Sequence, residues 1–408
     1  MESAPARAQT DDQTWPAASG QASLRQDVTA RLTCARTAAD TLSRDWEQLE
    51  AEASEPNAFA EHWFAAASLR HFARDRDIRL IEVRRGDRLI GVMPMHIVPR
   101  HGRIPIRHVE NWLHYHCFLA TPLIRQGEEQ AFWSALLDCL DREPWAQGFL
   151  HINGLVEHGP IHQGLLAAAR ELVRPCDTVL RIERAMLGGG LGAIAYYEHS
   201  VRKKKRKELK RLRTRLDELG TVAARTLSDP ADLASWCDDF LSLEKSGWKG
   251  REGSALGCAA DTEAFFREAV AGAFDAGQLE FLRLDLDGRP LAMLVNFITL
   301  PGSFSFKIAF DEDYARFSPG VLIQIENLAL LERPGFEWMD SCAVENHTMI
   351  NSLWAERRAI IRVSVPFGTE RSRIAFRLCR TIEELAAAVR RRLSPQPIAT
   401  VTEQESND

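Results

Sequence analysis

The segments IRLIEVRRGDRLIGVMPMHIV (78–98) and LEFLRLDLDGRPLAMLVNFIT (279–299) decide the fold of this chain. Each contains two runs in which apolar residues alternate with other residues. A turn pair separates the runs, Gly86–Asp87 in the first segment and Asp287–Gly288 in the second. Alternation with a period of two around such a pair predicts a β-hairpin. Because the same hairpin occurs twice, about 200 residues apart, the sequence predicts a duplicated domain.

The segments that flank the two hairpins also correspond. In both halves the predicted order is helix, hairpin, strand, helix, strand, helix. The corresponding pairs are helices at 57–74 and at 230–245 with 261–276, aromatic-rich strands at 110–120 and 303–311, helices at 128–142 and 320–332, short strands at 148–155 and 336–344, and helices at 160–171 and 347–358. A repeat of this length is too long for a solenoid. The fold class is therefore predicted to be α/β, with mixed α+β sheets, in two tandem domains.

Three consecutive glycines in LGGGLGA (187–193) separate the two halves. They fit neither a helix nor a strand interior. We therefore expect a glycine-rich linker at 187–195, between an N-terminal domain at 31–186 and a C-terminal domain at 196–393. Residues 1–30 and 394–408 are polar with few aliphatic side chains, and both tails are expected to be disordered.

The charge of the chain is unevenly distributed. There are 51 Lys and Arg residues against 57 Asp and Glu, a net charge of −6. The segment RKKKRKELKRLRTR (202–215) alone carries +9, so the remaining residues carry −15. An acidic body with one basic segment excludes a general nucleic-acid coat protein. Leucines at helical spacing predict that a helix at 202–219 docks along one side, and its first turns, 202–207, either contact phosphates or are simply solvated.

The composition also excludes other classes of protein. The longest strongly apolar run has about ten residues (291–300), against the roughly 20 needed to cross a bilayer, and no signal-peptide pattern is present. The eight cysteines form no C-x-x-C pair, so neither a disulfide framework nor a zinc cluster is expected. His114 and His116 would share a strand face but lack a third metal ligand. A reduced, cytoplasmic protein without a metal is the expectation.

The strongest local signal is FSFKIAFDEDYARFSPGVLIQIENLALL (304–331). Its first residues alternate as in a strand. Ser318 then suits a helix N-cap and Pro319 the first helical position. Gly320 lets a ligand approach the backbone, and Arg316 adds a positive charge. Such a strand–turn–helix binds a pyrophosphate at the helix N-terminus, or is a capped helix with no ligand.

Four segments resemble one family of enzymes. They are GWKGREGSAL (247–256), LDGRPLAM (286–293), FKIAFDEDYARFSPGVLI (306–323) and DSCAVENHTMINSLWAERR (340–358). Together with the basic helix, they resemble GNAT-type acetyltransferases of the CelD/BcsL-like type, which are linked to cellulose or exopolysaccharide synthesis. The resemblance covers residues 196–360 well and the first half loosely. This family is distantly similar to the Fem-type peptidyltransferases, whose two tandem GNAT-like domains agree with the duplication.

The resemblance implies acyl transfer from a thioester, acetyl-CoA or another acyl-CoA, to an amine or hydroxyl. It places the pyrophosphate of CoA at the loop Arg316, Phe317, Ser318, Pro319 and Gly320. This loop lacks the glycine-rich R/Q-x-x-G-x-G/A form that GNAT enzymes usually have. An acyl-carrier protein or an aminoacyl-tRNA is therefore the alternative donor.

Three residues are candidates for catalytic roles. His347 follows a predicted strand and is a candidate base near neutral pH; it fits equally well as a residue at a helix N-terminus. Asp340 is a candidate to orient an acceptor amine, or a cap of backbone groups at a strand end. Tyr314 is a candidate proton donor to the leaving thiolate, or a core tyrosine.

The candidate substrate contacts lie on two segments. Trp248, Lys249 and Arg251 are expected to form a lid over the donor or acceptor; a surface loop pinned by Trp248 is the alternative. Lys307 is expected to meet an anionic group of the donor or acceptor. Asp311 and its two acidic neighbours form either an acidic acceptor pocket or an ordinary solvated turn.

The sequence thus predicts an acyltransferase, most simply an N-acetyltransferase, acting by direct attack of a small-molecule, sugar or polysaccharide-precursor acceptor on the thioester. The alternative is an aminoacyl-tRNA-dependent Fem-like transferase or an RNA-binding module that uses 202–215. The first half has Ala120-Thr121-Pro122 in place of an SPG-like turn. It is expected to support the fold and to shape the acceptor cleft between the halves.

Overall fold

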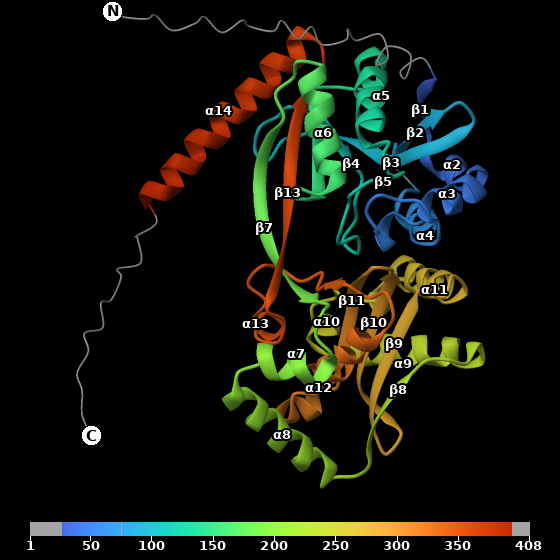
Figure 1. Ribbon diagram of the computed structural model, residues 1–408, viewed down its shortest axis with the longest axis vertical. Coiled ribbons are helices and arrows are strands. Elements are labelled where there is room, and N and C mark those ends of the chain that lie inside the picture. The colour runs from blue at the N-terminus through green and yellow to red at the C-terminus, as the bar shows by residue number, and fades with distance from the viewer. Residues whose placement is uncertain (1–26, 75, 394–408) are drawn as a thin grey trace, which may run out of the picture.

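The computed structural model describes residues 27–74 and 76–393. Figure 1 shows two lobes, one above the other, in which helices pack around the strands. Within the described residues the strands form one 13-stranded mixed sheet, which confirms the predicted α/β class with mixed sheets. The predicted disorder of both tails falls outside the described residues, except near residue 30, where the first strand already begins at Val28.

The first half of the chain supplies seven of these strands and most of the upper lobe. Its strands are β1 (Val28–Cys34), β2 (Arg79–Arg85), β3 (Arg88–Val98), β4 (His108–Asn111), β5 (Leu123–Ile124), β6 (Phe149–Val156) and β7 (Asp177–Gly188). Its helices are α2 (Ala35–Thr41), α3 (Ser43–Glu50), η1 (Ala58–Ala60), α4 (His62–Phe72), α5 (Glu129–Arg142) and α6 (Pro160–Glu171).

The second half has the same order of elements, preceded by two additional helices. Its strands are β8 (Val222–Thr226), β9 (Leu279–Leu286), β10 (Arg289–Thr299), β11 (Gly302–Phe310), β12 (Trp338–Asp340) and β13 (Glu356–Pro366). Its helices are α7 (Ala193–Ser200), α8 (Lys203–Asp217), η2 (Pro230–Asp232), α9 (Leu233–Ser246), α10 (Trp248–Arg251), η3 (Leu256–Cys258), α11 (Ala260–Asp275), η4 (Glu312–Phe317), α12 (Pro319–Glu326), η5 (Asn327–Glu332), α13 (Thr348–Asn351) and α14 (Glu370–Leu393).

Both predicted hairpins are confirmed. β2 pairs antiparallel with β3, and β9 pairs antiparallel with β10. In the second hairpin Asp287 and Gly288 have φ values of 51° and 83°, and two successive positive φ values are what a type I′ turn requires. The Asp–Gly pair therefore fixes the register of the hairpin on which the later site is built.

The two halves exchange their last strands. β6 lies parallel to β4, and β12 lies parallel to β11 in the equivalent place. β7 then pairs with β12 of the second half, whereas β13 pairs with β6 of the first half. β7 and β13 also pair with each other, which gives the strand order β1-β2-β3-β4-β6-β13-β7-β12-β11-β10-β9-β8. This exchange joins both lobes into one sheet, and it places β13 and α14 in the upper lobe (Figure 1).

The exchange bears on the expected domain boundaries. The expected linker at 187–195 begins inside β7, which ends at Gly188. The linker also ends inside α7, which begins at Ala193. The division into 31–186 and 196–393 follows the order of the duplicated elements along the chain and stays a prediction.

Two predicted elements are wrong. In place of a strand at 110–120, β4 ends at Asn111 and an irregular loop follows. In place of a helix at 347–358, α13 spans only Thr348–Asn351 and β13 begins at Glu356. A short apolar run such as this one fits either a helix or a strand. The partners that decide for a strand, β6 and β7, are distant in sequence.

The predicted basic helix is confirmed as α8. Leu209, Leu212 and Leu216 are buried, as the helical spacing predicts, whereas Leu219 is exposed and lies beyond the helix end. Part of the charge of α8 is paired, since Arg213 binds Asp217 at 3.0 Å and Glu326 at 3.2 Å.

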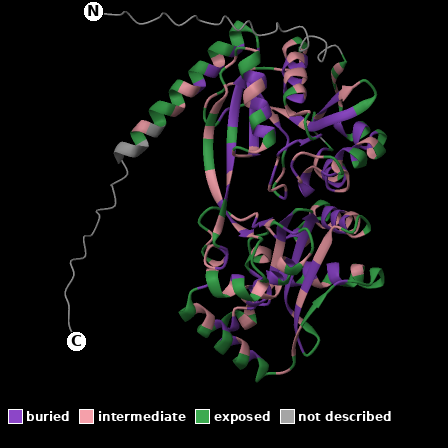
Figure 2. Ribbon diagram, viewed as in Figure 1, coloured by how far each residue is buried: buried purple, intermediate pink, exposed green. Residues whose placement is uncertain are grey.

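An aromatic cluster joins the two lobes. Phe59 of the first half lies 5.2 Å from Phe304 and 6.4 Å from Phe297, measured between ring centroids. These rings are buried in one cluster with residues of α4, α9 and α11. Figure 2 shows buried residues along the central strands of both lobes. The lobes are therefore packed against each other by apolar contacts as well as by the shared sheet.

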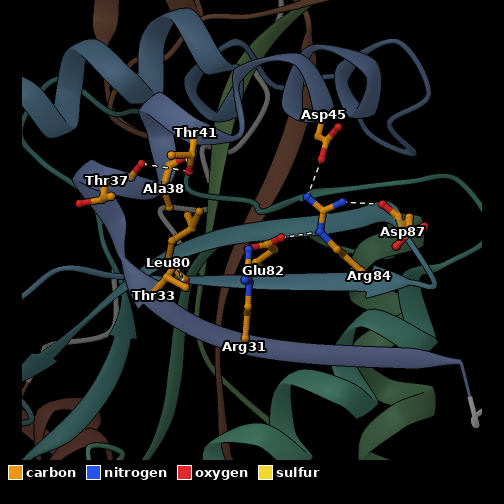
Figure 3. Close-up of polar contacts among 10 residues, drawn as sticks. All are labelled: Arg31, Thr33, Thr37, Ala38, Thr41, Asp45, Leu80, Glu82, Arg84 and Asp87. Atoms are coloured by element: carbon orange, nitrogen blue, oxygen red, sulfur yellow. Dashed lines mark hydrogen bonds and ion pairs between the residues drawn. The ribbon is translucent and has the colours of Figure 1, made fainter.

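A buried carboxylate stabilises the outer edge of the upper lobe (Figure 3). Glu82 of β2 is almost fully buried and accepts hydrogen bonds from Arg31 Nε at 2.8 Å and Arg84 Nε at 2.5 Å. Arg84 also contacts Asp45 of α3 at 2.5 Å. Because a buried charge is costly unless it is paired, these contacts hold β1, β2 and α3 together.

None of the helices in the described part of the chain combines the length and the apolar character that crossing a bilayer requires.

Candidate active site

The candidate site lies where two parallel strands separate. β11 and β12 pair only from Gly302 opposite Trp338 to Phe304 opposite Asp340. β11 continues to Phe310 with β10 on its other side, so one edge of residues 305–308 has no strand partner. The residues that follow the separation, 305–308 and 341–344, line a cleft of about 500 Å³.

Both halves of the chain contribute to this cleft. The first half adds parts of the loop at 113–120 together with Asn153 and Gly154. The exchanged strands add Leu180, Ile182 and Arg184 from β7 and 360–362 from β13. The cleft is therefore enclosed by both lobes, and neither half builds it alone.

Lys307 of β11 projects into an aromatic part of the cleft. Its Nζ lies 5.1 Å from the ring centroid of Phe118, 5.6 Å from that of Phe306 and 5.7 Å from that of Tyr115. The faces of aromatic rings attract a cation. Burial, reinforced by the nearby charge of Lys249, nevertheless lowers the pKa of Lys307 to about 8. Lys307 is thus a cation at neutral pH that loses its charge at mildly alkaline pH.

Lys249 is the second cation on this side of the cleft. Its Nζ lies 2.8 Å from Glu244 Oε1 and donates a hydrogen bond to the carbonyl oxygen of Ile308 at 3.1 Å. Its charge is therefore balanced by a buried carboxylate, and its position is fixed against the free edge of β11.

The remaining residues of the expected lid form the short helix α10. The backbone N–H of Trp248 donates to Glu312 Oε1 at 2.6 Å, and Arg251 forms an ion pair with Glu312 Oε2 at 2.6 Å. The hydrogen bond from Arg251 lowers the pKa of Glu312. Trp248 is half-exposed, and neither Trp248 nor Arg251 lines the cleft. Of the expected lid residues, the structure brings only Lys249 to the cleft.

Asp340 is fully buried at the end of β12. Its Oδ1 accepts a hydrogen bond from the backbone N–H of Cys342 at 2.8 Å. Two arginines approach it at longer distances, Arg184 at 3.6 Å and Arg358 at 3.5 Å. Asp340 therefore lies behind the cleft wall. Cys342 follows the strand with φ of 53°, and its contact with Asp340 fits the predicted alternative of a cap at a strand end.

His347 lines the cleft and also lies at the N-terminus of α13. Its position therefore fits both alternatives, a residue of the site and a residue at a helix N-terminus. Its Nδ1 accepts a hydrogen bond from the backbone N–H of Ile350 at 3.4 Å. In the neutral ring the proton then lies on Nε2, which can donate a hydrogen bond but cannot accept one. This geometry suits a donor toward a substrate oxygen better than it suits a base.

Other predicted site residues do not line the cleft. Tyr314 packs beside Phe317 against the core next to α8. The guanidinium of Arg316 lies over the ring of Phe317 at 4.7 Å. Ser318 occupies the N-cap position of α12, but it has φ of 54° and its side chain makes no capping hydrogen bond. Asp311 is buried and paired with Arg289 at 2.6 Å, so it is not part of an acidic pocket in the cleft.

The start of α12 nevertheless packs against side chains of β11 beside the cleft. A Cβ placed on Gly320 would lie 3.2 Å from Phe310 and 3.8 Å from Ile308, which lines the cleft. Gln324, one turn further along α12, lines the cleft directly. Pro319 and Gly320 are themselves buried.

The residues that the exchanged strands contribute, above all Arg184 and Arg362, were not predicted from the sequence. The signal was present in β7, where Leu180, Ile182 and Arg184 alternate toward one face and a charge interrupts an apolar series. That face could be assigned to the cleft only once β7 was known to pair with β12.

The equivalent position in the first half is closed. There β4 and β6 pair from Val109 opposite Leu150 to Glu110 opposite His151. The side chain of Asn111 then fills the separation, accepting a hydrogen bond from the N–H of Asn153 at 2.8 Å and donating to its carbonyl at 2.9 Å. Of these two strand separations, β4 from β6 and β11 from β12, only the second is open to a ligand.

The histidines that raised the question of a metal are packing residues. His114 and His116 lie in the loop after β4 against Phe72 and Phe265, and burial lowers the pKa of each to about 3. Among the described residues, no group of three or more His, Cys, Asp or Glu side chains is placed to hold a metal ion.

Comparison with known proteins gives a family match within the second half. Residues 203–347 match the acetyltransferase (GNAT) domain family. The crystal structure of FemX is similar to this chain with a TM-score of 0.51 at 10% identity, covering 79% of this chain and 95% of FemX. A conserved protein of unknown function from Bacteroides thetaiotaomicron has a TM-score of 0.48 at 12% identity, covering 79% and 97% of the two chains. Comparison with curated proteins gives no match.

The likeness to FemX shows a similar fold over most of both chains. The family match covers α8 to the start of α13, which includes both strands that separate at the cleft. The chain therefore folds as two GNAT-like domains, carries a GNAT acetyltransferase domain at residues 203–347, and is an acyltransferase.

Proposed function

We propose that the protein transfers an acyl group from an acyl-CoA thioester, most simply acetyl-CoA, to an amine or hydroxyl of a small-molecule acceptor. The separation of β11 and β12 carries this proposal. It leaves the backbone N–H and C=O groups of 305–307 along one edge of the cleft without a strand partner. An extended donor that contains amide groups, such as the pantetheine arm of CoA, can pair with such an edge as an added strand would.

The direction of the donor follows from the loop before α12. We propose that the phosphate end of CoA lies toward Arg316, Phe317, Ser318, Pro319 and Gly320, because Gly320 adjoins the side chain of Ile308, which lines the cleft. Arg316 is exposed there, and the first turn of α12 presents backbone N–H groups. The thioester end then lies deeper in the cleft, near Lys307. An acyl-carrier protein is the alternative donor, since it presents the same arm.

Direct attack needs few groups from the protein. The acceptor nitrogen or oxygen forms a bond to the thioester carbonyl carbon, the C–S bond breaks, and the electron pair leaves on sulfur. The proton lost by the acceptor passes to solvent, and the thiolate takes up a proton. We assign to Lys307 the stabilisation of negative charge on the carbonyl oxygen, and to the Nε2–H of His347 a hydrogen bond to a substrate oxygen. From behind the cleft wall, Asp340 positions Arg184 and Arg358. Tyr314 has no assigned contact with the reacting atoms.

The acceptor class is a further proposal. The motifs at 247–256, 286–293, 306–323 and 340–358 resemble the CelD/BcsL-like acetyltransferases, and this resemblance favours a sugar or polysaccharide-precursor acceptor.

Acetyl-CoA should raise the thermal unfolding midpoint of the protein, and Ser305→Phe should remove most of that shift. Ser305 lines the cleft on the free edge of β11, so a phenyl ring there occupies the path of the donor. At a hundredfold excess over Kd, binding stabilises a protein by about 2.7 kcal/mol. Differential scanning calorimetry with and without acetyl-CoA measures this shift.

Thr226→Phe is the matched control, because Thr226 is exposed on the edge strand β8, outside the cleft. It should keep the full shift. If acetyl-CoA, longer acyl-CoA and acyl-carrier protein all leave the midpoint of the unaltered protein unchanged, the proposed donor is wrong.

A tRNA-dependent transferase is the second candidate, and the charges on α8 favour it. Lys203, Lys204, Lys207 and Lys210 form no ion pair with a described residue, and such a row of free cations suits a phosphate backbone. Replacing Lys203, Lys204 and Lys207 by Gln should then abolish salt-dependent tRNA binding in a filter-binding assay. Absence of tRNA binding by the unaltered protein at low salt would exclude this candidate.

A further inference from the structure

The charged side chains in the cleft lining are all basic. Arg184, Lys249, Lys307 and Arg362 line it, and the lining contributed by the described residues includes no Asp or Glu. Lys249 is balanced by Glu244 behind it. The other three cations do not have a carboxylate of their own at the cleft surface, so the cleft attracts an anion.

The strongest excess of charge lies on the exchanged strands. Arg184 of β7 is directly opposite Arg358 of β13 in the ladder, and both side chains are buried. Like charges directly opposite each other across a strand pair are destabilising. Burial strengthens this repulsion and lowers the pKa of Arg358. The fold must therefore compensate these two charges locally.

The protein itself supplies only part of that compensation. Among the described residues, Asp340 is the one carboxylate within ion-pair distance of the two arginines, at 3.6 Å from Arg184 and 3.5 Å from Arg358. Its Oδ1 is already engaged by the N–H of Cys342. Arg358 has a second support, because its guanidinium lies 4.0 Å from the centroid of the Trp338 ring. One carboxylate is thus shared by two arginines at ion-pair distance. Arg358 also feels the charge of Glu55 from further away, so Arg184 has the weaker support.

Arg184 also has an unused donor. Its side chain is 6% exposed, and its Nε is buried without a hydrogen-bond partner among the described residues. A buried donor without a partner is uncommon and destabilising. Because Arg184 also lines the cleft, its guanidinium can meet a ligand that enters the cleft.

We propose that Arg184 binds an anionic group of the acyl acceptor, a carboxylate or a phosphate. This inference rests on the proposed acyl transfer. A guanidinium presents a planar fork that matches the two oxygens of such a group. The donor follows the edge of β11, whereas Arg184 belongs to β7, so the group that reaches Arg184 belongs to the acceptor. The reactive amine or hydroxyl then points toward the thioester near Lys307.

Matched pairs of probe acceptors test this inference. One pair is glucosamine 6-phosphate and glucosamine, and the other is an L-amino acid and its amide, over a panel of side chains. Release of CoA thiol from acetyl-CoA gives kcat/KM for each probe. The anionic member of a pair should be preferred about 10- to 100-fold, the range expected for one hydrogen-bonded charge. Arg184→Gln should remove this preference and leave KM for acetyl-CoA unchanged.

Two variants control for indirect effects. Arg181→Gln lies on the same strand, but Arg181 is half-exposed, pairs with Glu157 at 2.7 Å and Glu183 at 2.8 Å, and does not line the cleft. It should keep the preference. Arg184→Lys keeps the charge without the fork and should keep part of the preference; it replaces Arg184→Gln if that variant does not fold. Equal use of both members of every pair, or an equal loss for both in Arg184→Gln, overturns the inference.

A binding measurement separates this inference from the proposed function. Inorganic phosphate, compared with sodium chloride at the same ionic strength, should raise the unfolding midpoint of the unaltered protein and of Arg181→Gln more than that of Arg184→Gln. An equal shift in all three proteins overturns the anion site. If the shift depends on Arg184 but no probe is acetylated, the anion site stands and acyl transfer from acetyl-CoA fails. If Arg184→Gln instead raises KM for acetyl-CoA, the anion belongs to the donor and the assignment to the acceptor is overturned.

Discussion

Replacing Lys307 by Met should lower kcat/KM for acyl transfer about 10²- to 10³-fold, the cost typical of removing one group that stabilises an oxyanion. Lys307 lies in the aromatic part of the cleft, close to the rings of Phe118, Phe306 and Tyr115. Met has a similar length and no charge. The loss should therefore appear mainly in kcat, measured by thiol release at saturating acetyl-CoA.

The pH profile gives the same prediction an independent test. The pKa of Lys307 is lowered to about 8, so its ammonium form predominates below that pH and its neutral form above it. If the charged form stabilises the transition state, activity should fall as pH rises through about 8, and Lys307→Met should lack this fall. Lys245→Met, on the exposed face of α9 outside the cleft, should behave like the unaltered protein. Activity that rises through pH 8 in the unaltered protein but not in Lys307→Met would identify Lys307 as a base instead.

Ending the chain after Ala355 should abolish the folded state. This truncation removes β13, which lies between β6 and β7 in the sheet. It removes the buried side chains Ile360, Ile361, Val363, Val365 and Phe367. Each is worth about 1.5–3 kcal/mol on burial, so together they represent about 8–15 kcal/mol, comparable with the whole stability of a typical domain. Circular dichroism should show no cooperative unfolding transition.

Ending the chain after Thr369 is the matched control. It keeps β13 and removes α14, whose buried contacts centre on Phe376 and Cys379 against Phe149. Loss of α14 alone should lower the unfolding midpoint but leave a cooperative transition. A soluble, cooperatively folding protein that ends at Ala355 would show that the strand exchange is dispensable.

The parts of the fold that depend on local pattern could be predicted from the sequence. The Asp287–Gly288 turn and the alternation around it define a hairpin without any tertiary information. The leucine spacing of α8 likewise predicts which face is buried. The strand exchange could not be predicted, because the pattern of 356–366 does not reveal that its partners are β6 and β7.

The same distinction applies to the site. Lys307, Lys249 and His347 were found because they lie in or beside segments that resemble known acetyltransferases, and the structure places all three in the cleft. Arg184 was missed because its significance depends on what lies opposite and beside it, namely Arg358 and Asp340 from other strands. Asp311 was misjudged for a similar reason, since its partner Arg289 lies on the neighbouring strand β10.

The strand exchange has a consequence for the order in which the protein folds during synthesis. β6 is translated about 200 residues before β13, its partner in the sheet. Domains of a nascent chain commonly fold from the N-terminus onward, but here the upper lobe lacks a central strand until nearly the whole chain has left the ribosome. Until then, the edge of β6 in the upper lobe stays unpaired. An exposed edge of this kind is a template for unwanted pairing with other chains. Folding of the two lobes is in this sense a single event that the last strand completes.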